Sequence, residues 1–172
     1  MSKCKHEFHI IKGRAIVLGD NVDTDVIIPG RYLIYTNPKD LGKHVFEGID
    51  PTLPSRIKEG DIVVAGRNFG CGSSREHAVL AILGAGIKAV IAESFARIFY
   101  RNAINRGLPV IELPDIKGKV KEGDIITIDL KENTITLPTG EKLKFKPFSK
   151  EVMEILKTGG LLEYLKKRIK EA

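Results

Sequence analysis

The stretch that decides the fold covers residues 62–113, IVVAGRNFGCGSSREHAVLAILGAGIKAVIAESFARIFYRNAINRGLPVIEL. It contains three short apolar runs next to glycine, which are typical of buried strands: residues 62–65, 87–92 and 108–113. Between these runs, apolar residues recur at helical spacing, first from 76 to 85 and then from 95 to 103. A strand–helix–strand–helix–strand order with short links predicts right-handed crossovers onto a parallel sheet.

Three residues mark the expected ends of the two helices. Gly86 suits the C-terminal cap of the first helix, because helices often end on a residue in the left-handed region. Ser94 suits the N-cap of the second helix, since its hydroxyl can accept a hydrogen bond from a free amide. Gly107 is expected to stop that second helix.

The segments outside this stretch predict further strands and two closing helices. Residues 10–18 have the composition of a strand, whereas residues 31–54 lack periodicity and predict a long functional loop with a helical turn or two. Apolar runs at 125–128 and 134–137, joined by Lys-Glu-Asn, predict a β-hairpin. The closing helices are expected at residues 150–157 and 161–169.

Two segments, IKEGDIVVAG at 57–66 and VKEGDIITID at 120–129, resemble each other. We interpret the likeness as shared turn chemistry, a glycine-containing turn that starts a strand, rather than as an internal repeat. The predicted fold is therefore a single α/β domain over residues 1–172, with a central, largely parallel sheet, flanking helices and a β-rich border. Residues 1–9 are expected to form a flexible N-terminal tail.

Composition and charge exclude several classes of protein. The 172 residues are 42% hydrophobic and 29% charged, as in soluble globular domains. No apolar run approaches the roughly 18 residues of a membrane span, and the polar start MSKCKHEFH is unlike a signal peptide, so we expect a cytoplasmic protein. The net charge of +6 comes partly from a C-terminal run: Lys166, Lys167, Arg168 and Lys170. Because no aromatic residues interleave it, a solvated helix face is favoured over a nucleic-acid patch.

The two cysteines, Cys4 and Cys71, are far apart and have no CxxC partner. A disulfide framework is therefore not expected, and neither is a cysteine-ligated cluster held by this chain alone. Cys4, His6 and His9 lack a fourth ligand, so we read them as a solvated tail rather than a metal site.

Residues 66–77, GRNFGCGSSREH, carry the chemistry, because they join a buried strand to a helix. Gly70 and Gly72 permit backbone angles and close approaches that a Cβ would forbid. Ser73 and Ser74 lie where an N-cap is expected, so one of them would simply satisfy the first helical amides. The alternative is an anion site, in which those amides and the helix dipole act together with the Arg75 guanidinium. The pattern matches neither a P-loop nor the full dinucleotide fingerprint.

Three signatures give the chain a resemblance to the aconitase superfamily. FGCGSSREHA (69–78) resembles the active-site loop of its swivelling β/β/α domain. DNVDTDVIIPGRYL (20–33) and SFARIFYRNAINRGL (94–108) resemble two signatures of its stand-alone small subunits. The resemblance implies a hydro-lyase that removes water and adds it back, with Ser73 as the catalytic base and Ser74 and Arg75 as ligands of a substrate carboxylate. It also implies a partner, a large subunit carrying a 4Fe-4S cluster, over which the small subunit closes as a lid.

Asp20, Asp23 and Asp25 begin like a calcium loop, but Asp25 stands where that loop needs glycine and Arg31 where it needs glutamate. No metal site is therefore expected on this chain. The resemblance implies that Asp25 helps to organise the substrate pocket, with a weaker claim for Asp23. Asp20 is read as a turn residue.

The stretch YLIYT (32–36) bears on the substrate. Homoaconitase-like small subunits carry, at the position of Ile34, an arginine that binds the distal carboxylate of a tricarboxylic acid. Ile34, Leu33 and Tyr35 offer no cation, so a third carboxylate would stay unpaired at a cost of several kcal/mol. An isopropyl group would instead gain about 1–3 kcal/mol by burial. We therefore expect interconversion of 2- and 3-isopropylmalate, a step of leucine biosynthesis, unless Ile34 is ordinary core and specificity lies elsewhere, for example with Arg31.

Other readings stay open. Within the same class, the substrate would be homoaconitate, or a range that includes citraconate and methylmalate. From other classes, the chain would be a module that binds a phosphorylated ligand, or an RNA-binding protein acting through its basic tail. Arg67, Arg97 and Arg101 would face substrate, solvent or partner. Cys71 is read as a small packing residue that is also a possible oxidation target.

Overall fold

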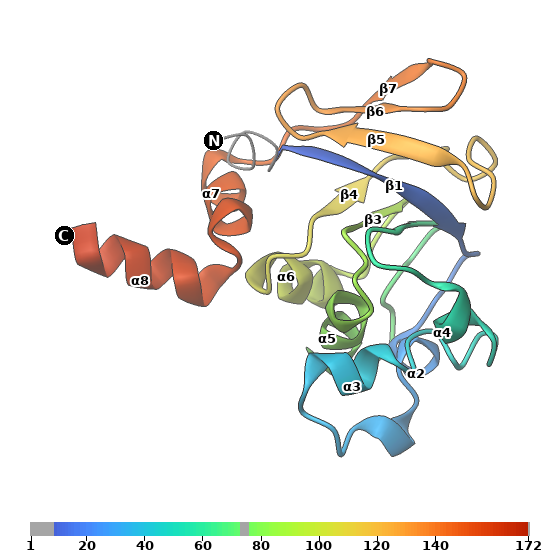
Figure 1. The fold of residues 1–172 in the computed structure, drawn as a ribbon. Coiled ribbons are helices and arrows are strands. Elements are labelled where there is room, and N and C mark those ends of the chain that lie inside the picture. Colours follow the sequence, from blue (N-terminus) through green and yellow to red (C-terminus); the bar gives the residue numbers. More distant parts are fainter. Residues whose placement is uncertain (1–8, 73–75, 172) are drawn as a thin grey trace.

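A computed structural model describes residues 9–72 and 76–171 of the chain. Its centre is a seven-stranded sheet in the order β4-β3-β2-β1-β5-β6-β7 (Figure 1). The strands are β1 (Ile10–Val17), β2 (Ile62–Ala65), β3 (Ala89–Ala92), β4 (Val110–Glu112), β5 (Ile125–Asp129), β6 (Thr134–Thr136) and β7 (Lys142–Lys144). The helices are α2 (Thr24–Ile27), the 3-10 helix η1 (Gly30–Tyr32), α3 (Pro38–Gly42), α4 (Leu53–Arg56), α5 (Glu76–Gly84), α6 (Arg97–Asn105), α7 (Lys150–Thr158) and α8 (Leu161–Glu171).

The strand β1 joins two kinds of pairing. Its second part pairs in parallel with β2, in the register Ala15 to Ile62, and the parallel order continues through β3 and β4. Its first part pairs antiparallel with β5, in the register Ile10 to Asp129, and β6 and β7 extend that border. The predicted parallel centre and β-rich border are therefore confirmed, and the α/β class with them.

Side chains of the parallel strands alternate between two hydrophobic cores. Val63 and Val90 point into the core that α5 and α6 cover, together with Ala81 and Phe99. Ile62, Val64 and Ile91 point into the second core, which the antiparallel border covers with Ile126, Ile128 and Ile135. Because β2 and β3 are buried on both faces, their sequences IVVA and AVIA are apolar throughout.

The second helix of the crossover begins later than expected. The N-cap of α6 is Ala96, which makes no side-chain cap hydrogen bond, so the assignment of that role to Ser94 was wrong. Ser94 Oγ instead accepts from the amide of Asn68, at 2.8 Å. The Phe69 amide donates to the Ser94 carbonyl (3.0 Å) and the Ala96 amide to the Phe69 carbonyl (2.9 Å). This extended pairing holds residues 94–96 out of the helix. The helix ends at Gly86 and Gly107 are confirmed, with φ of +86° and +84°.

The two similar segments form the same turn. The Asp61 carboxylate accepts from the Lys58 amide at 2.8 Å, and the Asp124 carboxylate accepts from the Lys121 amide at 2.9 Å. In both turns the glycine before the aspartate is left-handed. The interpretation as shared turn chemistry is confirmed.

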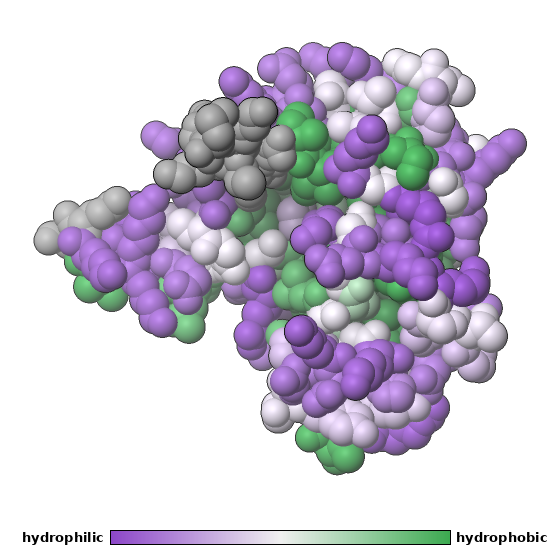
Figure 2. Space-filling view, in the orientation of Figure 1, coloured by the Kyte–Doolittle hydropathy of each residue, from purple (hydrophilic) through white to green (hydrophobic). Residues whose placement is uncertain are grey.

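The predicted aperiodic loop 31–54 contains part of η1, all of α3 and the first half of α4, and therefore has helical turns as expected. At the other end of the chain, α7 and α8 project from the body (Figure 1). The predicted basic run lies exposed on α8, and apolar side chains show along the same helix, where Leu162, Leu165 and Ile169 are exposed (Figure 2). None of the helices in the described residues is long and apolar enough to cross a membrane.

Candidate functional site

The loop after β2 lies at the carboxyl edge of the parallel strands, between the loops that follow β1 and β3. On one side, the Gly70 amide donates to the Val22 carbonyl (2.7 Å) and the Thr24 amide to the Cys71 carbonyl (2.9 Å). On the other side it pairs with residues 94–96 as described above. Ligands of open α/β sheets commonly bind at this edge. The three segments that resemble aconitase-type signatures therefore meet in one place.

Gly70 and Gly72 both have left-handed backbones, with φ of +84° and +95°. A Cβ on Gly70 would lie 2.2 Å from Cγ of Phe99, so only glycine fits there. A Cβ on Gly72 would lie 3.4 Å from Asp23 Cβ and from Thr24 Oγ1. The residues predicted to supply an anion loop are thus packed against α6 on one side and the start of α2 on the other.

Phe69 forms the floor of the loop. Its side chain is fully buried, and three further rings meet it edge to face at centroid distances of 6.4, 5.9 and 5.2 Å: Phe46, Phe95 and Phe99. Such edge-to-face pairs each add about 0.5–1.5 kcal/mol beyond simple burial. The loop therefore rests on a packed base.

The three predicted aspartates occupy different positions. The Asp23 carboxylate accepts from the amides of Asp25 (2.8 Å) and Val26 (3.1 Å), and so caps α2. Asp20 accepts from the Arg67 amide at 2.8 Å, and that bond, with the nearby Lys117, lowers the pKa of Asp20. Both partners are distant along the chain, so these contacts do not test the local turn role expected for Asp20, which stays a prediction. Asp25 is exposed in the first turn of α2, beside the loop.

Ser73, Ser74 and Arg75 lie outside the described residues, between Gly72 and the first residue of α5, Glu76. Their predicted roles as base and carboxylate ligands remain predictions. The acidic residue of the first turn of α5, Glu76, pairs with Arg106 at 2.9 Å. Part of its negative charge is thereby compensated close to where the predicted anion site would lie.

The three residues predicted to discriminate substrates lie in the loop 33–36, which we call the Ile34 loop. Ile34 is 80% exposed at the tip of this loop. Leu33 packs against the helix-side core, and Tyr35 is partly exposed. Ile34 is therefore not ordinary core, and its side chain is available for contact with a ligand.

Sequence reasoning missed two residues that hold the Ile34 loop in place, His44 and Glu47. Glu47 accepts hydrogen bonds from the Tyr32 hydroxyl and from Arg31 (2.9 Å), and it also bonds His44 Nδ1 at 2.9 Å. The bonds from Tyr32 and then His44 lower the pKa of Glu47. The only signal for His44 and Glu47 in the sequence was their spacing by three residues, and nothing in it linked them to Tyr32.

The remaining residues whose roles the sequence left open differ in their exposure to solvent. Arg67, Arg97 and Arg101 are exposed, and Arg67 lies 4.0 Å from the Asp20 carboxylate. Cys71 is half-buried in the loop, and burial, followed by the charge of Asp23, raises the pKa of its thiol. A thiol with a raised pKa is a poor nucleophile and a poor metal ligand at neutral pH. Across residues 9–72 and 76–171, no group of three or more His, Cys, Asp or Glu is arranged to hold a metal ion.

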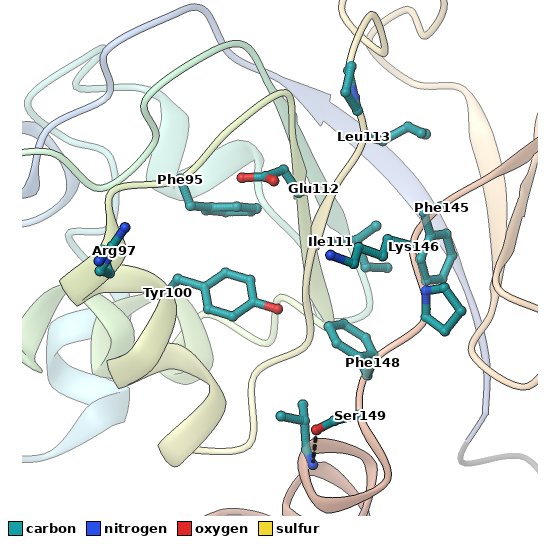
Figure 3. A pocket seen from close by; sticks show the side chains of 13 residues that line it. Phe95, Arg97, Tyr100, Ile111, Glu112, Leu113, Phe145, Lys146, Phe148 and Ser149 are labelled. Carbon is teal, nitrogen blue, oxygen red and sulfur yellow. Dashed lines mark hydrogen bonds between the residues drawn. The ribbon is translucent and has the colours of Figure 1, made fainter.

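A separate groove of about 650 Å³ lies between α6, β4 and the segment before α7 (Figure 3). Phe95, Tyr100 and Phe148 form apolar walls, with Glu112 and Lys146 among the charged lining residues. Burial and then the charge of Glu112 raise the pKa of Tyr100. Arg97, whose role the sequence left open, lines this groove, but none of the residues predicted as base, carboxylate ligand or substrate loop does.

Comparison with known proteins covers nearly the whole chain. Residues 54–116 match the family of the aconitase C-terminal domain. The chain is 57% identical over 164 residues to the isopropylmalate/citramalate isomerase small subunit of Methanocaldococcus jannaschii, covering 95% of this chain and 98% of that protein. It is 56% identical over 163 residues to the 3-isopropylmalate dehydratase small subunit of Halothermothrix orenii, covering 94% and 99%. The crystal structure of 3-isopropylmalate dehydratase from M. jannaschii matches with a TM-score of 0.88 at 55% identity, covering 93% of this chain and 95% of the other.

Proposed function

Because the chain belongs to the family of 3-isopropylmalate dehydratase small subunits, we propose that it interconverts 2- and 3-isopropylmalate together with a large subunit. One observation of the structure supports this function above the others. The loop that leads to Ser73, the segment that carries Asp25 and the helix α6 are hydrogen-bonded or packed together at one edge of the sheet. A base and a pocket residue can therefore act on one molecule.

In the proposed mechanism, Ser73 removes the proton from the carbon next to a carboxylate of the substrate. The hydroxyl group leaves the neighbouring carbon to give the alkene, and together with the proton taken by Ser73 it makes up one molecule of water. Water then adds back with its hydrogen and hydroxyl on exchanged carbons. Ser74 and Arg75 hold the substrate carboxylate. The N-terminus of α5 favours the alkoxide of Ser73, because amides and the positive end of the helix dipole stabilise negative charge.

The departing hydroxyl needs a Lewis acid, and the described residues do not fit an iron–sulfur cluster. They contain a single cysteine, Cys71, whose thiol has a raised pKa. We therefore propose that the large subunit holds a 4Fe-4S cluster, which would supply that Lewis acid. The cytoplasmic location expected from the sequence also stays a prediction.

The exposed apolar tip of the Ile34 loop supports a branched alkyl substrate over a tricarboxylic acid. It does not exclude a smaller group, since a missing methyl costs only about 1–3 kcal/mol. The name of the M. jannaschii relative, which includes citramalate, favours this wider range as the second candidate.

The test is hydration of three alkenes, isopropylmaleate, citraconate and homoaconitate, by the chain reconstituted anaerobically with its large subunit. We expect the wild type to prefer isopropylmaleate, Ser73→Ala to lose at least a hundredfold in kcat, and Ile34→Arg to shift preference toward homoaconitate. Ser55→Ala, which changes an exposed serine on α4, is the matched control and should retain full activity.

Activity that survives Ser73→Ala would overturn the mechanism. A wild-type preference for homoaconitate would overturn the substrate and leave the family unaffected. Tight binding of inorganic phosphate by the isolated chain, measured by calorimetry, would favour the binding-module alternative. RNA binding that weakens steeply with salt and survives Ser73→Ala would favour the nucleic-acid alternative.

A further inference from the structure

The carboxylate of Glu47 binds three donors that come from both sides of the loop. Its Oε1 accepts from the Tyr32 hydroxyl and from Arg31, and its Oε2 bonds His44 Nδ1. We call Arg31, Tyr32, His44 and Glu47 the Glu47 cluster. Hydrogen bonds to a charged acceptor are stronger than neutral ones, so these contacts resist opening of the loop.

Aromatic stacking adds a second set of contacts between the two ends of the Ile34 loop and His44. The Tyr32 ring lies flat on the His44 ring, with centroids 3.7 Å apart and planes at 9°. The Tyr35 ring lies nearly parallel to both rings, 6.2 Å from His44 and 6.4 Å from Tyr32. Tyr32, before Leu33 and Ile34, is thus stacked directly on the imidazole, and Tyr35, after them, lies near the same pair of rings.

The support beneath Glu47 is part of the core. The Phe46 side chain is fully buried, and its backbone is left-handed at φ +59°. The Phe46 amide donates to the Ile27 carbonyl at 2.7 Å, and the Gly48 amide to the Val26 carbonyl at 3.2 Å. Glu47 thus stands between two residues bonded to α2, and it connects the Ile34 loop to the segment that carries Asp25.

We propose that Glu47, through Tyr32 and His44, is a positioning residue that fixes the Ile34 loop and so sets the discrimination between branched and short alkyl groups. The inference rests on the proposed function. Ile34 has little packing of its own, because most of its side chain is exposed. The exposed Ile34 side chain can favour an isopropyl group only if the backbone of the loop is already held in place, because ordering the loop on binding would cost free energy.

The experiment compares kcat/KM for isopropylmaleate and citraconate in the reconstituted complex for wild type, Tyr32→Phe, Glu47→Gln and Glu47→Ala. In Glu47→Ala, we expect kcat/KM for isopropylmaleate to fall about tenfold, the scale of one hydrogen bond to a charged group, and that for citraconate to fall less than about threefold. Glu47→Gln should partly restore the ratio, because it keeps an acceptor for Tyr32. Asp50→Ala is the matched control: its carboxylate also accepts from two residues, Thr52 and Arg56, but not from the loop.

A double-mutant cycle tests whether Glu47 acts through Ile34, and it needs only isopropylmaleate. The effect of Glu47→Ala should largely disappear in an Ile34→Ala background, because the residue being positioned is then gone. Hydrogen exchange on the full chain gives a readout without activity. The Tyr35 amide, which donates to the Tyr32 carbonyl at 3.1 Å, should exchange at least tenfold faster in Glu47→Ala.

An unchanged substrate ratio together with lower thermal stability would reduce Glu47 to a structural residue and overturn the inference. Additive effects in the cycle would do the same. Failure of the proposed function looks different, because the wild-type complex would then hydrate neither alkene, while the Tyr35 amide would still respond to Glu47→Ala.

Discussion

Gly70 shows how a single residue allows the loop after β2 to pack closely against α6. Its left-handed backbone disfavours any side chain, and a Cβ at this position would lie only 2.2 Å from Cγ of Phe99. We expect Gly70→Ala to lower the free energy of unfolding by about 2–4 kcal/mol, combining overpacking with the strain of a left-handed alanine. Urea unfolding measures this.

The control at the same scale is Gly30→Ala. A Cβ on Gly30 meets nothing within 4 Å, so this variant should unfold within about 0.5 kcal/mol of the wild type. If Gly70→Ala were as stable as Gly30→Ala, the loop would have to pack differently against α6.

At the scale of elements, α3 and α5 touch through glycines. A Cβ on Gly84 would lie 1.7 Å from the Pro38 carbonyl oxygen, and one on Gly42 would lie 2.5 Å from the Ala85 amide. The close contact places the segment after the Ile34 loop directly on the helix that follows Ser73. The distance between the two predicted functional segments therefore depends on these glycines.

Gly84→Ala sets two effects against each other. Alanine favours a helix over glycine by about 1 kcal/mol, whereas the clash with the Pro38 carbonyl can be relieved only by moving α3. We expect the clash to dominate, with a net loss of about 1–3 kcal/mol in stability and reduced kcat/KM. Thermal unfolding measures the stability, and the isopropylmaleate assay measures kcat/KM. A more stable, fully active variant would contradict the close contact.

At the scale of the whole molecule, the two faces of the sheet are covered by different elements. The antiparallel border and its core lie on one face, whereas α5 and α6 lie on the other and carry the site to the carboxyl edge. The described residues present carboxylates and exposed arginines at that edge and no metal-binding group. In the proposed function, this chain binds and deprotonates the hydroxy acid, and the large subunit activates the hydroxyl.

This division predicts that neither subunit is active alone. The isolated chain should hydrate none of the three alkenes, and addition of the large subunit should restore hydration in proportion to the amount of complex formed. The control is the large subunit by itself. Hydration by the isolated chain would mean that it supplies its own Lewis acid, against the proposed division of roles.

The sequence by itself determined the elements that local patterns encode. β2 at residues 62–65, the helix ends at Gly86 and Gly107, and the two Lys-Glu-Gly-Asp turns follow from side-chain periodicity and from backbone conformations available within a few residues. The sequence also singled out residues 66–77 and 32–36 as candidate functional segments, because their signatures are contiguous.

Only the tertiary structure decided how distant segments meet. α6 begins at Arg97 rather than after Ser94 because Ser94 is bonded to Asn68, 26 residues earlier. The Glu47 cluster exists because a carboxylate meets a hydroxyl 15 residues away along the chain, on a stretch without periodicity. Such contacts depend on how the packed core orients each loop, and no local pattern in the sequence carries that information.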